Sequence, residues 1–209
     1  MPAVQLTQRT LALGLQYLSE CDADLAQILS KLGPPPMWPR EPGFPTLIHI
    51  ILEQQVSLAS ALAAFNRLLA AASPLTPQRF LELGDVSLKN IGFSRQKMVY
   101  SRYLAESIVQ GRLDLEMLST MDDQTARSAL LQLKGIGPWT ADIYLLMALR
   151  RPDMWPSGDL ALAKAVQVVK RLPFRPSPDQ LDEIAQLWQP WRAVAARLLW
   201  HYYLNGGRA

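Results

Sequence analysis

The chain has 209 residues and a net charge of +3, with 49% hydrophobic and 19% charged residues, enough for one large core or two smaller helical lobes. Its single cysteine, Cys21, excludes an internal disulfide and a four-cysteine iron–sulfur cluster. The two histidines, His49 and His201, cannot form a zinc site without carboxylates.

Helical periodicity dominates the chain, and strand signals are nearly absent. In chain order, the expected helices span residues 6–18, 24–32, 46–53, 57–72, 77–83, 94–110, 115–118, 124–133, 138–149, 160–172, 178–187 and 191–204. Ser57 and Ser94 are suitable caps for two of these starts, and Asp122 or Asp123 can cap a third. We find no repeat of solenoid period. The sequence therefore predicts an all-α protein.

One proline-rich segment, residues 33–45, interrupts this pattern with GPPPMWPREPGFP. It cannot be helical, because proline lacks the backbone donor and restricts the residue before it. We expect a connector between lobes, with a polyproline ligand for a partner domain as the alternative.

The basic residues are unevenly distributed. Residues 134–209 carry ten Lys and Arg against six Asp and Glu. A second concentration lies between residues 89 and 102, which contain no acidic residue; its members are Lys89, Arg95, Lys97 and Arg102. Such a patch is typical of a surface that follows phosphates, although a solvated helix face would have the same composition.

The most informative stretch is residues 133–141, LKGIGPWTA, between two predicted helices. Gly135 and Gly137 permit backbone angles and close approaches that side chains forbid. Pro138 suits the first position of a helix, where its missing N–H costs nothing. A tight hairpin of this kind presents backbone N–H groups that suit a phosphate. An ordinary turn between helices, with the glycines as caps, is the alternative.

Asp159 follows the loop 151–158 (RPDMWPSG) and precedes the helix expected at 160–172. It is a good N-cap, and many aspartates in this setting do nothing else. The same position also favours an ionised carboxylate through the helix dipole.

Residues 133–166 closely resemble the helix-hairpin-helix, Gly/Pro-rich loop and Asp signature of a DNA glycosylase superfamily, in particular its DNA-3-methyladenine glycosylase II branch. Residues 51–68 are similar to the family's helix pair with a central Gln-Gln-x-Ser. Residues 91–118 resemble its Gly-x-Ser-x-x-Lys helix, and residues 185–206 its closing helix. The larger bacterial members carry an additional N-terminal β domain, so this chain resembles the compact form.

The resemblance implies a two-lobed, all-α fold with the active site in the cleft between lobes. We expect residues 1–32 and 146–209 to form one N/C-terminal lobe, and residues 33–145 a central lobe that ends in the hairpin. It also implies that Asp159 is the catalytic carboxylate of an enzyme that flips a base from duplex DNA and hydrolyses its glycosidic bond. An alkylated purine is already cationic and leaves as a neutral base, so one carboxylate can suffice where ordinary glycosidases need two.

Trp139 occupies the position at which lyase-competent relatives, such as endonuclease III and the 8-oxoguanine glycosylases, carry their catalytic lysine. Lys134 precedes the hairpin and is not equivalent, so we expect a monofunctional enzyme without a Schiff base. Trp139 and Tyr202 are the expected walls of the base pocket, where aromatic faces favour a cationic base. Ile143 departs from one branch of the family, in which an aromatic residue stands here. Core packing is the alternative for Trp139.

Gln55 matches the residue that family members insert into the duplex, with Gln54 as the competing choice and a turn cap as the structural alternative. The expected phosphate contacts come from Gly135, Ile136, Gly137 and Thr140. The family also implies a Na⁺ or K⁺ ion at the hairpin, held by the backbone of Leu131, Leu133 and Ile136. No cofactor is expected to be required.

The expected partner is double-stranded DNA that contains alkylated bases, and the protein is expected to be a monomer. No signal peptide and no apolar run of about 20 residues is evident, so we expect a soluble, intracellular, DNA-associated protein of the cytoplasm, nucleoid or nucleus. Three alternatives stay open: a non-catalytic helix-hairpin-helix DNA-binding protein, a glycosylase for hypoxanthine or uracil, and a helical adaptor that uses the proline-rich segment.

Overall fold

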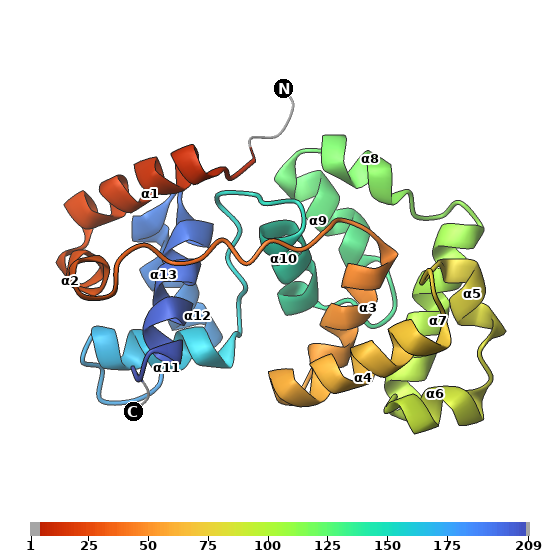
Figure 1. Cartoon of the computed structure of the whole chain (residues 1–209). Coiled ribbons are helices and arrows are strands. Elements are labelled where there is room, and N and C mark those ends of the chain that lie inside the picture. The colour runs from red at the N-terminus through yellow and green to blue at the C-terminus, as the bar shows by residue number, and fades with distance from the viewer. Residues whose placement is uncertain (1–4, 208–209) are drawn as a thin grey trace. The chain divides into compact units, whose positions relative to one another are not determined.

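The computed structural model describes residues 5–207, and within them it contains thirteen α-helices, one 3-10 helix and no strand (Figure 1). The prediction of an all-α protein is therefore confirmed. None of the helices in this part of the chain combines the length and apolarity needed to cross a membrane.

The described chain divides into two compact units. The central unit comprises Arg40–Tyr144, and the terminal unit comprises residues 5–39 and 145–207. The division at residue 40, and not at 33, follows from the packing of the proline-rich segment with the terminal unit. Arg197 Nε donates to the Met37 carbonyl oxygen at 3.1 Å, and both residues belong to that unit.

The central unit is built around α3, whose residues from Leu47 to Glu53 are buried except His49. This helix packs against α4 and α7, and the Phe80 ring contacts the rings of Phe44 and Phe93, each with centroids 5.8 Å apart. The helices of this unit are α3 (Phe44–Glu53), α4 (Leu58–Ala71), α5 (Pro77–Glu82), α6 (Asp85–Ile91), α7 (Arg95–Val109), α8 (Leu115–Thr120), α9 (Asp123–Leu131) and most of α10 (Pro138–Met147).

The terminal unit is organised around α13, in which every residue from Ala193 to Trp200 is buried. A helix that is apolar on all sides must be surrounded, and α13 accordingly packs against α1, α2 and α11 (Figure 1). The helices of this unit are α1 (Gln8–Cys21), α2 (Ala23–Leu32), α11 (Leu160–Val169), α12 (Pro178–Ala185), the 3-10 helix η1 (Gln186–Trp188) and α13 (Arg192–Leu204).

Arg197 is fully buried on α13 and explains the path of the proline-rich segment. Its guanidinium donates to the carbonyl oxygens of Met37, Ala193 and Leu146 at 3.1, 3.1 and 2.9 Å. Burial lowers the pKa of this guanidinium to about 10. Trp38 has a φ of +44°, a left-handed conformation that interrupts a polyproline helix. A continuous polyproline helix through residues 33–45 is therefore excluded, and the segment connects α2 to α3.

Candidate active site and DNA interface

The predicted hairpin lies between α9 and α10 and consists of residues 132–137. Gly135 has a φ of +90°, and a Cβ atom at this position would collide with the Tyr100 ring of α7. Only glycine satisfies both conditions. Gly137 is different, because its φ is not in the left-handed region and a Cβ atom there would meet no atom of the chain within 4 Å. The absence of a side chain at Gly137 keeps the backbone accessible from outside.

The first turn of α10 begins at this accessible backbone. The Ala141 amide makes the first intrahelical bond, to the Gly137 carbonyl at 3.0 Å. Gly137 and Pro138 before it are exposed, so the N-terminal end of α10 is open to solvent. Arg127 of α9 braces the two helices, since its Nε donates to Asp142 Oδ1 at 2.6 Å.

The turn after α3 contains Gln54 and Gln55, the two candidates for insertion into the duplex, and their environments differ. Gln54 is half-buried, and its Nε2 donates to the Gly135 carbonyl at 3.0 Å and to Thr140 Oγ1 at 2.9 Å. Gln55 is exposed and has a φ of +59°, an uncommon conformation for a residue with a side chain. Gln54 therefore fastens this turn to the hairpin, whereas Gln55 extends its side chain into solvent. Thr140 is buried and its hydroxyl serves this internal contact, so the structure does not support the expected phosphate contact by Thr140.

Two members of the predicted basic patch serve structural roles. Lys97 Nζ donates to the Leu52 carbonyl at 2.7 Å and so caps the end of α3, and burial lowers the pKa of this ammonium group. Arg102 donates to the Leu83 carbonyl at 2.7 Å and pairs with Asp85 at 2.8 Å. Lys89 and Arg95 are exposed and remain the patch members that face solvent.

Asp159 caps α11, as its position before the helix indicates. Its Oδ1 accepts the Leu162 amide at 2.9 Å and the Trp200 indole Nε1 at 3.2 Å. The carboxylate is half-buried in the terminal unit, and Trp200 reaches it from the buried helix α13. Both donors contact the same carboxylate oxygen, so together they fix the orientation of the group. Trp200 was not among the site residues expected from the sequence, and no local sequence signal marks this contact.

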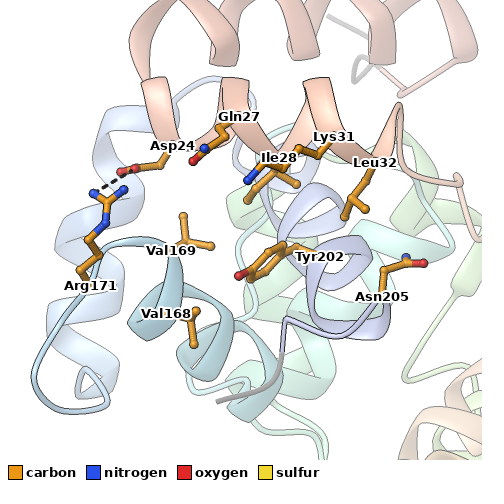
Figure 2. A pocket seen from close by; sticks show the side chains of 10 residues that line it. All are labelled: Asp24, Gln27, Ile28, Lys31, Leu32, Val168, Val169, Arg171, Tyr202 and Asn205. Atoms are coloured by element: carbon orange, nitrogen blue, oxygen red, sulfur yellow. Dashed lines mark ion pairs between the residues drawn. The ribbon is translucent and has the colours of Figure 1, made fainter.

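Tyr202 does not lie beside Asp159. It lines a pocket with Val168 and Val169 at the C-terminal end of α11, whereas Asp159 precedes the N-terminal end (Figure 2). Residues 200 and 202 differ by two positions on α13, which is about 200° of rotation, so they point to opposite sides. The expectation that Tyr202 forms a wall of the pocket around Asp159 is therefore corrected, and Trp200 is the aromatic residue at that carboxylate.

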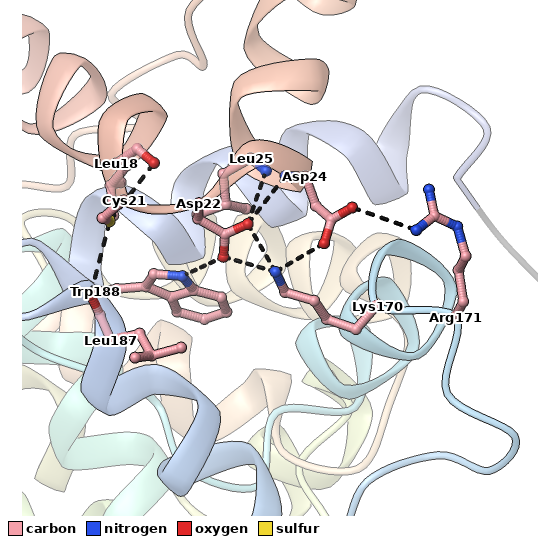
Figure 3. Close-up of polar contacts among 9 residues, drawn as sticks. All are labelled: Leu18, Cys21, Asp22, Asp24, Leu25, Lys170, Arg171, Leu187 and Trp188. Carbon is pink, nitrogen blue, oxygen red and sulfur yellow. Dashed lines mark hydrogen bonds and ion pairs between the residues drawn. The ribbon is translucent and has the colours of Figure 1, made fainter.

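The C-terminal end of α11 is held by a partly buried ion pair (Figure 3). Lys170 Nζ lies 2.7 and 2.8 Å from the two oxygens of Asp22 and 2.9 Å from Asp24 Oδ2. The Trp188 indole also donates to Asp22 at 2.8 Å, and the Leu25 amide to Asp22 at 3.3 Å. Burial alone would raise the pKa of the Asp22 carboxyl, but the hydrogen bonds from Lys170 and Trp188 outweigh burial and lower it.

The loop before Asp159 is fastened at its start. Asp153 Oδ1 accepts from the backbone amide and Nε of Arg192, and Asp153 Oδ2 accepts from Nη2 at 2.9 Å. Ser157 Oγ donates to Asp182 at 2.8 Å near the end of the loop. These contacts fix the approach of the chain to Asp159. Trp139, the other expected pocket residue, is half-buried in the central unit.

A family model described as the HhH-GPD superfamily of base excision DNA repair proteins matches residues 48–190. This region includes the hairpin, Gln54, Gln55 and Asp159.

Several known proteins are similar to the chain. A putative DNA-3-methyladenine glycosylase of Bacillus subtilis is 28% identical over 74% of this chain and 56% of the relative. DNA-3-methyladenine glycosylase 1 of Schizosaccharomyces pombe is 26% identical over 88% of this chain and 84% of the relative. The chain thus spans little more than half of the bacterial relative and most of the yeast one.

Among solved structures, an S. pombe 3-methyladenine DNA glycosylase in complex with abasic DNA has a TM-score of 0.87 at 24% identity and covers 94% of this chain and 98% of its own. A DNA-3-methyladenine glycosidase of Bacillus halodurans has a TM-score of 0.74 at 27% identity and covers 90% and 87%. The two-lobed helical glycosylase fold predicted from the sequence agrees with these neighbours.

Proposed function

Because the chain belongs to the HhH-GPD superfamily of base excision DNA repair proteins, we propose that it is a monofunctional DNA glycosylase that excises alkylated bases of the 3-methyladenine and 7-methylguanine type from duplex DNA. The observation that carries this proposal is the Asp159 carboxylate, held at the start of α11 by the Leu162 amide and the Trp200 indole. The names of the relatives support the choice of alkylated bases as substrates.

In this mechanism Asp159 acts on the sugar and not on the base. A base alkylated at a ring nitrogen carries a positive charge and departs as a neutral molecule, so no general acid is needed. Positive charge then develops on the deoxyribose, and the Asp159 carboxylate stabilises it electrostatically while water attacks. The two N–H donors keep the carboxylate oriented, so Trp200 is a positioning residue.

The absence of lyase activity forms part of the proposal. The residue two positions after Gly137 is Trp139, where lyase-competent relatives carry lysine, and Lys134 lies before the hairpin. An indole cannot form a Schiff base with the abasic sugar. A borohydride trap on methylated duplex DNA should therefore capture no covalent complex. Trp139 is proposed to form a wall of the base pocket.

The central unit is proposed to hold the duplex. The accessible backbone at Gly137, at the start of α10, suits a phosphate. Gln55 is proposed as the residue that fills the space of the flipped base, because it is exposed whereas Gln54 is bonded to the hairpin. Exposed Lys89 and Arg95 are proposed to add salt-dependent affinity.

A monovalent cation at the hairpin would use main-chain carbonyls. Among residues 5–207, no group of three or more His, Cys, Asp and Glu side chains could hold a metal ion. The Leu133 carbonyl already accepts the Ile136 amide at 3.0 Å, and a carbonyl oxygen has a second lone pair for a cation. The carbonyls of Leu131, Leu133 and Ile136 would hold Na⁺ or K⁺ in the proposed enzyme and reinforce the turn that binds phosphate.

A base-release assay on methylated duplex DNA tests the function, with Asp159→Asn as the main variant. Asparagine caps helices as well as aspartate does, so this change removes the charge and retains the cap. Asp114→Asn is the matched control, because Asp114 caps α8 through the Glu116 and Met117 amides. We expect release by the wild type and the control, and a loss of at least 100-fold in Asp159→Asn, in the range known for electrostatic stabilisation of a transition state.

Two outcomes would refute the proposal. Equal release by Asp159→Asn and the wild type would remove the catalytic role of the carboxylate. Duplex binding without release by any form of the protein would instead indicate a non-catalytic DNA-binding protein.

A further inference from the structure

The end of α11 that is remote from Asp159 carries a second surface that the proposed reaction does not use. Ten residues of helix, about 15 Å, separate the two ends. At this remote end lies a pocket of about 220 Å³ between α2, α11 and α13 (Figure 2). We refer to this pocket together with the loop 171–176 as the distal surface.

The pocket combines an apolar interior with a polar rim. Ile28, Leu32, Val168 and Val169 provide apolar walls, and Tyr202 lies among them (Figure 2). Gly207 also lies against the Tyr202 ring, because a Cβ atom at Gly207 would collide with it. The rim includes the amide side chains of Gln27 and Asn205, which can both donate and accept hydrogen bonds. A planar, polar-edged ring fits such a site.

The charges at the rim favour an anion. Lys31 and Arg171 both line the pocket, and both are exposed. Lys170 is shared between Asp22 and Asp24, so its single charge neutralises only one of the two carboxylates. The charges of Lys31 and Arg171 exceed the remaining negative charge by one. Arg171 lies 3.8 Å from Asp24, and its side chain is 79% exposed (Figure 3). A long, exposed ion pair contributes little, so Arg171 can turn to a phosphate at low cost.

The loop that follows α11 adds an exposed aromatic ring. Phe174 is 80% exposed, the largest exposed fraction among the exposed large hydrophobic residues. Pro173 and Pro176 restrict the backbone around it, and Arg175 is an exposed cation beside it. Phe174 follows Arg171 by three residues, so the two Cα atoms lie within about 11 Å. The loop therefore presents an aromatic face to solvent and carries two exposed arginines, Arg171 and Arg175.

We propose that the distal surface binds single-stranded nucleic acid. One base enters the Tyr202 pocket, a neighbouring base stacks on Phe174, and Arg171 and Arg175 contact the phosphates. Aromatic faces that alternate with cations are the usual means of binding a single strand without reading its sequence. An acidic peptide would use the cations but would gain little from two planar aromatic surfaces. This site is separate from Asp159 and does not depend on base excision.

The test uses the full chain and a fluorescein-labelled hexamer of deoxyadenosine, with binding followed by anisotropy at low salt. Phe174→Ala removes one stacking face, and Val168→Trp fills the pocket. Each should weaken binding about 5- to 100-fold, as expected for the loss of one stacked base. Leu187→Ala, another exposed apolar deletion (65% exposed), should leave binding unchanged. Arg171→Glu should weaken binding and reduce its salt dependence, whereas Arg9→Glu on α1 should do neither.

Two competitors distinguish the ligands. Free deoxyadenosine monophosphate should compete much less well than the hexamer, because it uses only one of the two stacking sites. A hexaglutamate peptide should also compete poorly. Equal competition by either one would overturn the proposal, since the first would indicate a mononucleotide site and the second a surface that recognises charge alone.

Unchanged hexamer binding in both Phe174→Ala and Val168→Trp, with thermal melting curves that show folded protein, would also overturn it. Base release from methylated duplex DNA should be the same in Phe174→Ala and the wild type. A failure of the distal site is thus separable from a failure of the proposed glycosylase activity.

Discussion

The Trp200 indole provides a sharp test of how the candidate catalytic carboxylate is held. Trp200→Phe removes the donor that lies 3.2 Å from Asp159 Oδ1 and leaves the Leu162 amide in place. A hydrogen bond to a charged group contributes about 1.5–3 kcal/mol, and the length of this one places it near the lower end. A loss of about 1.4 kcal/mol in the transition state corresponds to about a tenfold slower reaction. Single-turnover base release should fall by this factor, and the duplex affinity should not change.

Trp188→Phe is the matched control for this prediction. It removes an equivalent indole donor, at 2.8 Å, from the carboxylate of Asp22 in the same unit. Both variants should lower the free energy of unfolding by about 1–3 kcal/mol, because both rings are buried. Only Trp200→Phe should slow base release by the folded enzyme. Equal rates in the two variants would refute a positioning role for Trp200.

Three further predictions concern the hairpin glycines, the two glutamines after α3, and the ion pair between Asp22 and Lys170. Gly135→Ala should lower the free energy of unfolding by at least about 2 kcal/mol because of its φ of +90° and the adjacent ring, whereas Gly137→Ala should leave unfolding in urea unchanged and weaken duplex binding. Gln55→Ala should slow base release from duplex DNA without a change in melting temperature, and Gln54→Ala should lower the melting temperature; the reverse pattern would exchange their roles. The pKa of the Asp22 carboxyl is lowered in the fold, so its stabilisation is present above about pH 4 and is lost as the pH falls through the folded-state value; Asp22→Asn should flatten this acid limb of a stability–pH curve.

The positions of most helices could be predicted from the sequence, because side-chain caps define their starts. The side chains of Ser57, Ser94 and Asp122 each accept a hydrogen bond from a backbone amide in the first turn of the helix that follows, α4, α7 and α9 respectively. Helix α6 was missed, since it has only seven residues between Gly84 and Gly92 and no side-chain cap. Its one local signal is the left-handed Gly92 at the C-terminal end.

The contacts of the candidate site were less predictable than its motifs. The place of Asp159 as the N-cap of α11 could be predicted from the sequence. Whether Trp200 or Tyr202 faces Asp159 depends on the rotation of α13 about its axis. A helix that is buried on nearly all sides has no one-sided hydrophobic pattern from which this rotation could be predicted. Which of Gln54 and Gln55 is exposed depends on the left-handed backbone conformation of Gln55. No glycine or asparagine in this stretch indicates that conformation.

The discontinuous construction of the terminal unit has a consequence for biosynthesis. Arg197 joins α13 to the Met37 carbonyl across 160 positions of sequence, so the two parts of this unit come from opposite ends of the chain. During translation, α1 and α2 emerge first, but their apolar faces are covered only when α11 and α13 follow. Residues 40–144 form a contiguous segment that is complete before α11 and α13 are made. The half of the protein that carries Asp159 is therefore the last to be assembled on the ribosome.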